Sequence, residues 1–224
     1  MWSSTRGQAA VTELLIERGA LPNEKTKDGL TALMFASTLG QTETLKILLA
    51  HGAEVNARSN DGSSALMFAS ENGNPASVKL LLDQGANVHA KNHVGLMPLM
   101  FAAMRDNCQA AEALLIQKAD IHARDRYGFT ALHFAVLIGR PAVSKLLLEK
   151  GANPNDQAMD GYTPLMFAAE DGNVLIAKAL LAKGADIHLQ NKKGHTALMI
   201  AQDSRQQEVI RLLESVSARK EISR

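Results

Sequence analysis

Histidine and cysteine are the residues of this chain best suited to metal binding or nucleophilic chemistry, and their spacing argues against both. The sequence has seven histidines and one cysteine. His89, His122 and His188 lie at one equivalent place of a repeating pattern, where other copies of the pattern have asparagine. Equivalent atoms of stacked repeats lie about 10 Å apart, too far to share a zinc ion. We therefore interpret this series as a polar turn position.

Catalytic motifs are not found in the sequence. It has no phosphate-binding glycine loop, no Gly-x-Ser-x-Gly, no His-Glu-x-x-His and no cysteine pair. Cys108 is alone, so no disulfide within the chain is possible, and we expect a buried or half-buried structural thiol at the start of a helix. Asp160, Glu170 and Asp171 are the acids an enzyme would need, but they fit a solvated acidic edge better. We therefore expect no enzyme, no cofactor and no metal ion.

Composition and charge argue against several further classes of function. The 224 residues are 46% hydrophobic and 21% charged, with no apolar stretch long enough to cross a membrane. The net charge is +1, and lysine and arginine are dispersed, which argues against nucleic acid or a lipid surface as partner. No signal peptide is visible at Met1. The compartment of this soluble chain is therefore open: periplasmic if a leader once preceded Met1, cytoplasmic otherwise.

The chain is built from repeats of 33 residues. One glycine series keeps this interval throughout: Gly29, Gly62, Gly95, Gly128, Gly161 and Gly194. A phenylalanine series does the same, with isoleucine in the last place: Phe35, Phe68, Phe101, Phe134, Phe167 and Ile200. Interleaved series of this kind indicate a repeat protein, in which each unit buries its apolar face against its neighbours.

A single unit shows why each segment folds as it does. Asp28 and Gly29 form a tight-turn dipeptide, in which glycine supplies the positive φ. Thr31 is a natural N-cap for a short helix that ends near Gly40. Leucines at helical spacing mark a second helix, which Gly52 closes as a left-handed C-cap.

These motifs resemble the ankyrin repeat over nearly the whole chain. The shared pattern is Asp-Gly-x-Thr-Ala/Pro-Leu, then paired short helices, then Gly-Ala-Asp/Asn-x-Asn/His-Ala. The resemblance implies an all-α solenoid of stacked helix-turn-helix units with β-turn or hairpin tips. It also implies a histidine that hydrogen-bonds between units, yet only His133 keeps it. Methionine, which packs adaptably, takes its place elsewhere: Met34, Met67, Met100, Met166 and Met199.

The repeat register predicts the domain organisation. We expect one ankyrin-repeat domain over residues 1–224. Met1 and Trp2 match the middle of a first helix, so we expect a truncated first repeat whose native upstream residues are missing. The expected segments are a truncated repeat at 1–25, full repeats at 26–58, 59–91, 92–124, 125–157 and 158–190, a capping repeat at 191–216, and a polar tail at 217–224.

A protein-binding face is the more productive hypothesis. The resemblance implies recognition through the turn tips, the outer ends of the first helices and the concave face. Three aromatics outside the repeating framework, Tyr127, Phe129 and Tyr162, all fall on predicted tips, and large side chains of this type dominate binding energy at interfaces. Scattered surface residues are the alternative interpretation. The predicted partner-binding residues are Val94, Leu96, Met104, Arg126, Tyr127, Phe129, Leu137, Ile138, Met159 and Tyr162.

The third full repeat breaks several local rules. Met97 replaces the threonine cap, at a cost of about 1 kcal/mol. Lys118 replaces the C-cap glycine, at a further cost of about 1 kcal/mol if the left-handed conformation is kept. Val94 replaces the turn aspartate and Asp106 a loop glycine. Such departures occur at functional sites, although drift tolerated by well-formed neighbours explains them equally.

Two functions remain open at this stage. The first is a monomeric, non-catalytic module that binds one folded protein. In one version it caps an enzyme such as a bacterial cell-wall hydrolase and protects the producing cell, by analogy with compact bacterial ankyrin proteins. The alternative is a cytoplasmic scaffold or regulator that bridges two proteins, the second of them held by Lys192 and Lys193.

Overall fold

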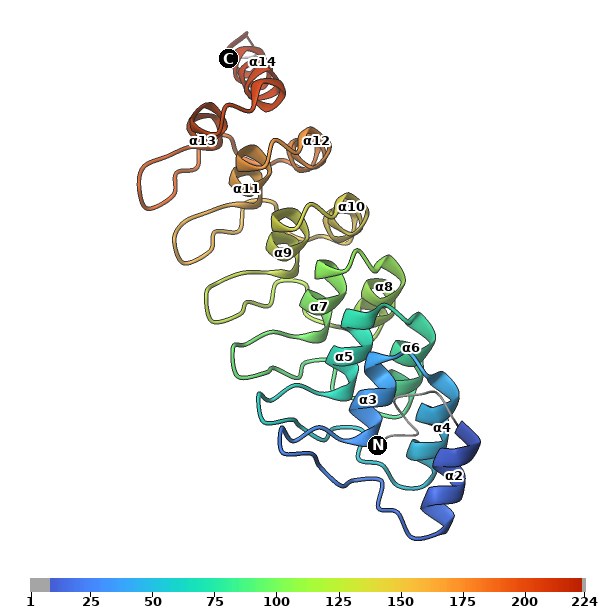
Figure 1. Cartoon of the computed structure of the whole chain (residues 1–224). Helices are drawn as coiled ribbons and strands as arrows, with labels where there is room; N and C mark the ends of the chain where they lie inside the picture. Colours follow the sequence, from blue (N-terminus) through green and yellow to red (C-terminus); the bar gives the residue numbers. More distant parts are fainter. Residues whose placement is uncertain (1–8, 223–224) are drawn as a thin grey trace. The chain divides into compact units, whose positions relative to one another are not determined.

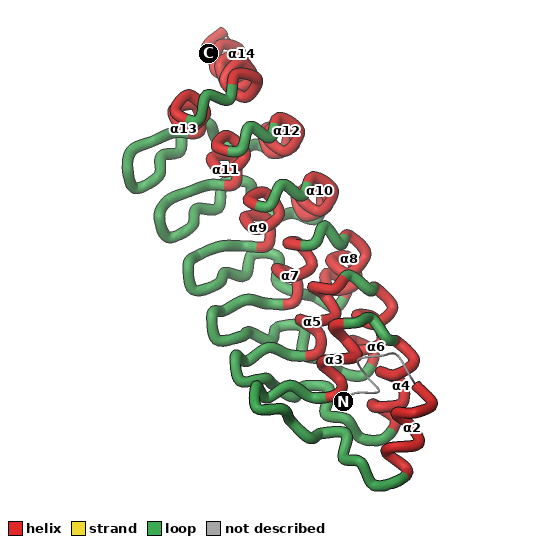
Figure 2. The backbone as a smooth tube through the Cα atoms, in the orientation of Figure 1, coloured by secondary structure: helices red, strands yellow, loops and turns green. Residues whose placement is uncertain are grey.

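The structure is a computed structural model that describes residues 9–222, and it is built from paired helices. No strand occurs in this range, and long loops join each helix pair to the next (Figure 2). The chain forms two compact units, residues 1–120 and 121–224. We call them unit 1 and unit 2 and describe each by itself. The predicted all-α architecture is confirmed.

Unit 1 contains two rows of helices. The first helices of its repeats, α3, α5 and α7, contact one another in sequence, and the second helices, α2, α4, α6 and α8, form a parallel row (Figure 1). The bounds are α2 Ala9–Glu17, α3 Ala32–Thr38, α4 Thr42–Ala50, α5 Ala65–Asn72, α6 Pro75–Asp83, α7 Pro98–Met104 and α8 Cys108–Ile116.

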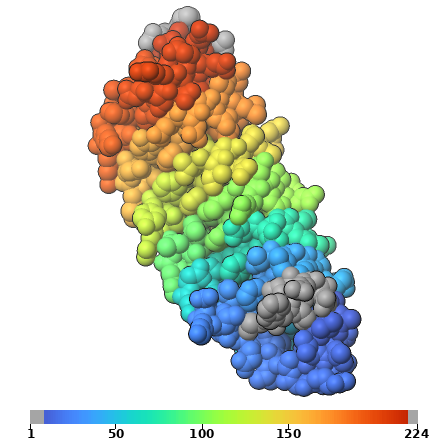
Figure 3. All heavy atoms as spheres, in the orientation of Figure 1, coloured from blue at the N-terminus to red at the C-terminus, as the bar shows by residue number. Residues whose placement is uncertain are grey.

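Unit 2 repeats the same plan. Its first helices α9, α11 and α13 pack in one row and its second helices α10, α12 and α14 in another. In the space-filling view its repeats, coloured yellow to red, form adjacent layers (Figure 3). The bounds are α9 Ala131–Leu137, α10 Pro141–Glu149, α11 Pro164–Glu170, α12 Val174–Ala182, α13 Ala197–Asp203 and α14 Gln207–Ile222.

The core of each unit lies between the two rows. Leucines of the second helices, such as Leu48 and Leu81 in unit 1 and Leu147 and Leu180 in unit 2, are at most 1% exposed. Each helix is short and amphipathic, so a single pair has little apolar area to bury, and stability comes from contact between successive repeats.

Predicted caps start the first helices. Thr31 accepts a hydrogen bond from the Met34 amide at 3.4 Å, and Thr163 accepts one from the Met166 amide at 3.3 Å. Pro164 follows Thr163 in the first turn, where its missing amide hydrogen costs nothing. Met97 makes no side-chain capping bond at the start of α7, as expected.

The sequence made one prediction for each end of the chain. The predicted first helix around Met1 and Trp2 lies outside the described residues. The last helix, α14, was expected to end at residue 216 before a polar tail, but it continues to Ile222. That expectation was wrong because lysine, arginine and glutamate favour helix as strongly as leucine does, so the polar composition of this segment does not end the helix.

Lys118 occupies the left-handed conformation that glycine has in the other repeats. Its φ is +62°, and Gly85 one repeat earlier has φ +81°. We expect Lys118→Gly to raise the free energy of unfolding by about 0.5–1 kcal/mol, because a side chain is strained in this region and glycine is not. Urea unfolding followed by circular dichroism measures the change. The reverse substitution Gly85→Lys should destabilise by a similar amount, and an unchanged midpoint for both would contradict the strain.

Candidate protein-binding surface

The turn tips of unit 2 are held in register by backbone hydrogen bonds. Within one tip, the Asp125 amide bonds the Phe129 carbonyl at 3.0 Å, and the Asp125 carboxylate accepts the amides of Tyr127 and Phe129. Between tips, the Met159 amide donates to the Tyr127 carbonyl oxygen at 2.8 Å. Arg124 adds a bond to the Gln157 carbonyl oxygen and an ion pair with Asp156 at 2.7 Å. The tips are therefore preorganised for binding.

Two large side chains project from these tips. Tyr127 is 56% exposed and Met159 is 61% exposed. The single backbone hydrogen bond between the two residues places them on neighbouring tips. Exposed groups of this size on a fixed backbone have the character of interface hot spots.

Phe129 and Tyr162 were predicted to lie outside the repeating framework, but both rings pack against it. Both are half-buried. The Phe129 ring lies 5.4 Å from the Phe134 ring and 5.6 Å from the Phe167 ring, and the Tyr162 ring lies 5.0 Å from the Phe167 ring. They pack on framework phenylalanines, since a side chain two residues past the tip folds back over the first helix. We call Phe129, Phe134, Tyr162 and Phe167 the aromatic cluster.

Two further predicted residues of unit 2, Leu137 and Ile138, lie at the C-terminal end of α9. Leu137 and Ile138 are 40% and 42% exposed. A helix of this length is about 10 Å long, and half-buried Phe134 lies between its two ends. Phe134 therefore belongs to the same helix as Leu137 and also contacts Phe129, which follows the tip. The sequence analysis missed this contact of Phe134, because its regular spacing indicated a framework residue only.

His133 ties neighbouring repeats together beneath the cluster. Its Nδ1 accepts the Thr130 amide at 3.1 Å, so Nε2 carries the proton and faces the Tyr162 carbonyl oxygen at 3.4 Å. Burial lowers the pKa of His133, while the Tyr162 carbonyl and Asp156 partly oppose this change. In the next repeat Met166 replaces the imidazole, and its sulfur accepts the Thr163 amide at 3.4 Å. The bond between repeats that the resemblance implied is thus present at His133.

The other three predicted residues belong to unit 1. Val94 and Leu96 are half-buried, and their amides both donate to the Asn92 side-chain oxygen. Met104 is half-buried at the end of α7. Seven of the ten predicted residues belong to unit 2: Arg126, Tyr127, Phe129, Leu137, Ile138, Met159 and Tyr162. We call these seven the unit 2 surface.

Comparison with known proteins agrees with this geometry. A family model described as ankyrin repeats (3 copies) matches residues 1–92, 84–158 and 153–223. The chain belongs to the ankyrin repeat family. A solved structure, the human ASB11 ankyrin repeat domain, is similar with a TM-score of 0.87 and 29% identity, over 94% of this chain and 95% of that one. No curated protein sequence matches the chain.

Family membership bears on the kind of function. Ankyrin repeat domains are typically protein–protein interaction modules and are generally not catalytic. Among the described residues, no helix has the length and apolarity needed to cross a membrane.

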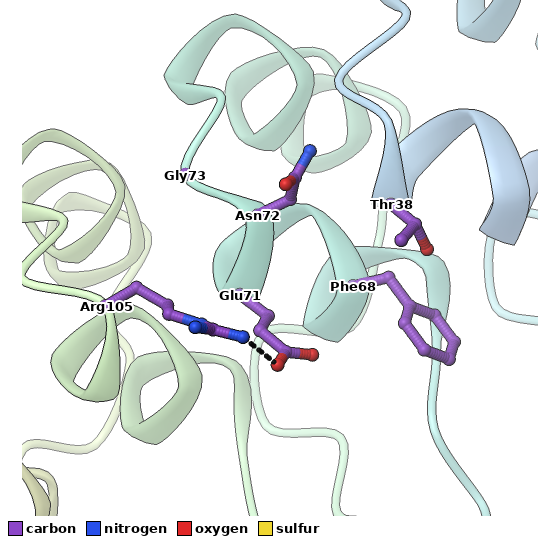
Figure 4. A pocket seen from close by; sticks show the side chains of 6 residues that line it. All are labelled: Thr38, Phe68, Glu71, Asn72, Gly73 and Arg105. Carbon is purple, nitrogen blue, oxygen red and sulfur yellow. Dashed lines mark hydrogen bonds and ion pairs between the residues drawn. The ribbon is translucent and has the colours of Figure 1, made fainter. Parts of the chain in front are cut away.

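The ankyrin repeats of unit 1 also enclose a surface hollow that the sequence reasoning missed. Its volume is about 400 Å³, and its lining residues are Thr38, Phe68, Glu71, Asn72, Gly73 and Arg105. Arg105 reaches back to Glu71 with a 2.9 Å ion pair across the hollow (Figure 4). In the sequence, the hollow is indicated only by Glu71 and Arg105, an acid and a base that lie near the ends of the first helices of neighbouring repeats. Because the ion pair satisfies both charges, the hollow offers no unpaired charge to a ligand.

Other candidate groups offer little for catalysis or metal binding. Cys108 begins α8 as predicted and is half-buried, and burial together with Asp106 and Glu112 raises its pKa, so the thiol is a poor nucleophile. No group of three or more histidine, cysteine or acidic residues in the described range could hold a metal ion. At the histidine place in the repeat, Asn23 and Asn56 bond the backbone of the following repeat, which agrees with a structural turn position.

Proposed function

We propose that this ankyrin repeat chain is a non-catalytic binding module that holds a folded protein partner through the unit 2 surface. The observation that carries the proposal is the pair of exposed side chains, Tyr127 and Met159, on tips joined by a backbone hydrogen bond. Fixed tips lose little conformational entropy on binding, so most of the contact energy is available for affinity.

The size and composition of the surface support the same proposal. A standard interface buries about 800 Å² on each partner, an area that several adjacent repeats supply. Leu137 and Ile138 are exposed apolar groups of unit 2, and Arg126 and Glu170 are exposed charged groups of the same unit. Protein interfaces combine apolar and charged groups of these kinds.

The test is capture of partners from cells of the source organism. We expect immobilised wild-type protein to retain a partner that Tyr127→Ser/Met159→Ser binds at least tenfold more weakly, since each hot-spot side chain contributes roughly 1–2 kcal/mol. Mass spectrometry identifies and quantifies the retained proteins. These substitutions leave the half-buried Phe129 and Tyr162 in place, so the fold should be kept, and circular dichroism checks this.

Leu175→Ser is the matched control. Leu175 lies on α12 in the same unit and is 64% exposed, close to the 61% of Met159. Its removal should leave capture unchanged. If the double variant and the control retain the same proteins as the wild type, the unit 2 surface is not the binding site. The captured protein also separates the two roles, because an inhibitor retains an enzyme that it inactivates and a scaffold retains two proteins that bind independently.

A further inference from the structure

The tips of unit 2 carry cations that nothing in the described structure neutralises. Arg126, Lys192 and Lys193 are all exposed, and we call them the basic tip row. No ion pair in the described part of the chain engages any of the three. By contrast, the nearby Arg124 is tied to Asp156 and to backbone oxygens.

Backbone hydrogen bonds place these cations beside the exposed apolar groups. The Met159 amide bonds the Tyr127 carbonyl oxygen, and the Lys192 amide bonds the Asp160 carbonyl oxygen at 2.9 Å. The three tips of unit 2 therefore follow one another as neighbouring loops (Figure 1). Arg126 lies at one end of this row and the two lysines at the other, with Tyr127 and Met159 between them.

Acidic groups in the same tips offset only part of the positive charge of the row. Asp125 is half-buried and accepts two backbone amides, and exposed Asp160 accepts the Tyr162 amide at 3.0 Å. Both carboxylates keep their negative charge, so the three cations exceed the two carboxylates by one. The tips of unit 1 differ, with Lys27 as their only lysine or arginine beside Asp28 and Asp61. The chain as a whole has a net charge of +1, so the basic character is local to unit 2.

We propose that the partner of the unit 2 surface presents acidic side chains around an apolar group, the carboxylates meeting the basic tip row and the apolar group lying between Tyr127 and Met159. This inference rests on the proposed function and adds the chemistry of the partner. Complementary charge at the edge of an interface speeds association and excludes wrong partners, while the apolar centre supplies most of the affinity.

A protein is a better partner for the basic tip row than a nucleic acid is. Binding to a phosphate backbone depends on neutralising many regularly spaced phosphates, and here only three cations are present, with Asp160 among them. In the aromatic cluster Phe167 is buried, the other three rings are half-buried, and the rings pack on one another, so they are not free to stack on bases as in single-strand binding.

A display library of short random peptides, selected on the full wild-type chain, tests the partner chemistry directly. We expect the selected peptides to be enriched in aspartate and glutamate next to an aromatic or aliphatic residue, and to lose affinity as salt is added. Against Arg126→Glu/Lys192→Glu/Lys193→Glu their affinity should fall about tenfold or more.

The control variant changes the net charge by the same amount, but its substitutions lie away from the tips. Lys150→Glu/Lys178→Glu/Lys183→Glu reverses three exposed lysines on or next to the second helices of unit 2, and should keep peptide binding within about twofold, because exposed charges beyond the interface are screened. Circular dichroism confirms that both triple variants are folded.

The outcomes separate this inference from the proposed function. If selected peptides are not enriched in acids, or bind the tip-row variant normally while Tyr127→Ser/Met159→Ser abolishes binding, the acidic partner is wrong and the binding surface stands. If neither variant weakens the binding of the selected peptides, both are overturned. Tighter binding of an oligouridylate than of any selected peptide, lost on reversing the tip row, would assign the row to nucleic acid instead.

Discussion

Replacing Phe167 by alanine should lower the free energy of unfolding by about 3 kcal/mol, the lower end of the range for removing a buried phenylalanine. Phe167 is 8% exposed and its ring lies 5.0 Å from Tyr162 and 5.6 Å from Phe129. The substitution removes the contacts of Phe167 with both neighbours, although Phe129 still packs on Phe134 and His133. Urea unfolding of the full chain measures the loss, and hydrogen exchange should locate it in residues 121–224.

Phe68 offers the matched control for this prediction. It has the same place in its repeat as Phe167 but is half-buried, and it lines the hollow of unit 1 (Figure 4). Its ring makes no contact with another ring in the described residues, so Phe68→Ala should cost only about 1–2 kcal/mol. Equal losses for the two variants would show that the aromatic cluster contributes nothing beyond one ordinary phenylalanine.

His133 should make the stability of the chain depend on pH below neutrality. Burial holds the pKa of His133 below its usual value, with the Tyr162 carbonyl and Asp156 opposing and Arg124 adding to the effect. As the pH falls, the unfolded chain therefore takes up the proton first, near the ordinary histidine pKa of about 6.5. Stability is full above that pH and declines below it, with a slope of up to about 1.4 kcal/mol per pH unit from this residue.

His133→Met removes the titrating group and keeps the local structure. Met166 shows that a methionine sulfur at this place accepts the N-cap amide, so the variant should fold. Unfolding free energies measured between about pH 5 and pH 7.5 should fall less on the acidic side for the variant than for the wild type. Parallel curves would mean that His133 titrates alike in the folded and unfolded chains, contrary to its buried position.

The two residues of these predictions, Phe167 and His133, are neighbours in the structure. The His133 ring lies 5.4 Å from the Phe129 ring and 6.3 Å from the Phe167 ring, so the buried histidine forms part of the support for the aromatic cluster. Damage to either residue should therefore also loosen the tips that carry Tyr127 and Met159. Partner capture by Phe167→Ala is expected to weaken even though that residue is not at the exposed surface.

Local chemistry was enough to predict the repeat and its elements from sequence. Thr31 and Thr163 start helices because a hydroxyl satisfies an amide of the first turn, and that bond needs no distant partner. For Lys118 the sequence left open whether the left-handed conformation of the equivalent glycines is kept, and the structure shows that it is. The helical continuation to Ile222 was missed because polar composition was weighed above helix propensity.

Side-chain exposure depended on tertiary contacts, some within a repeat and some between neighbouring repeats. Phe129 and Tyr162 looked like free tip residues, yet Phe129 packs on Phe134 of its own repeat and on Phe167 of the next, and Tyr162 packs on Phe167 within its own repeat. Tyr127 makes no ring contact among the described residues and is exposed. Spacing along the chain places a residue on a tip, whereas its burial depends on the volume that neighbouring repeats leave open, and that volume exists only after the repeats have stacked.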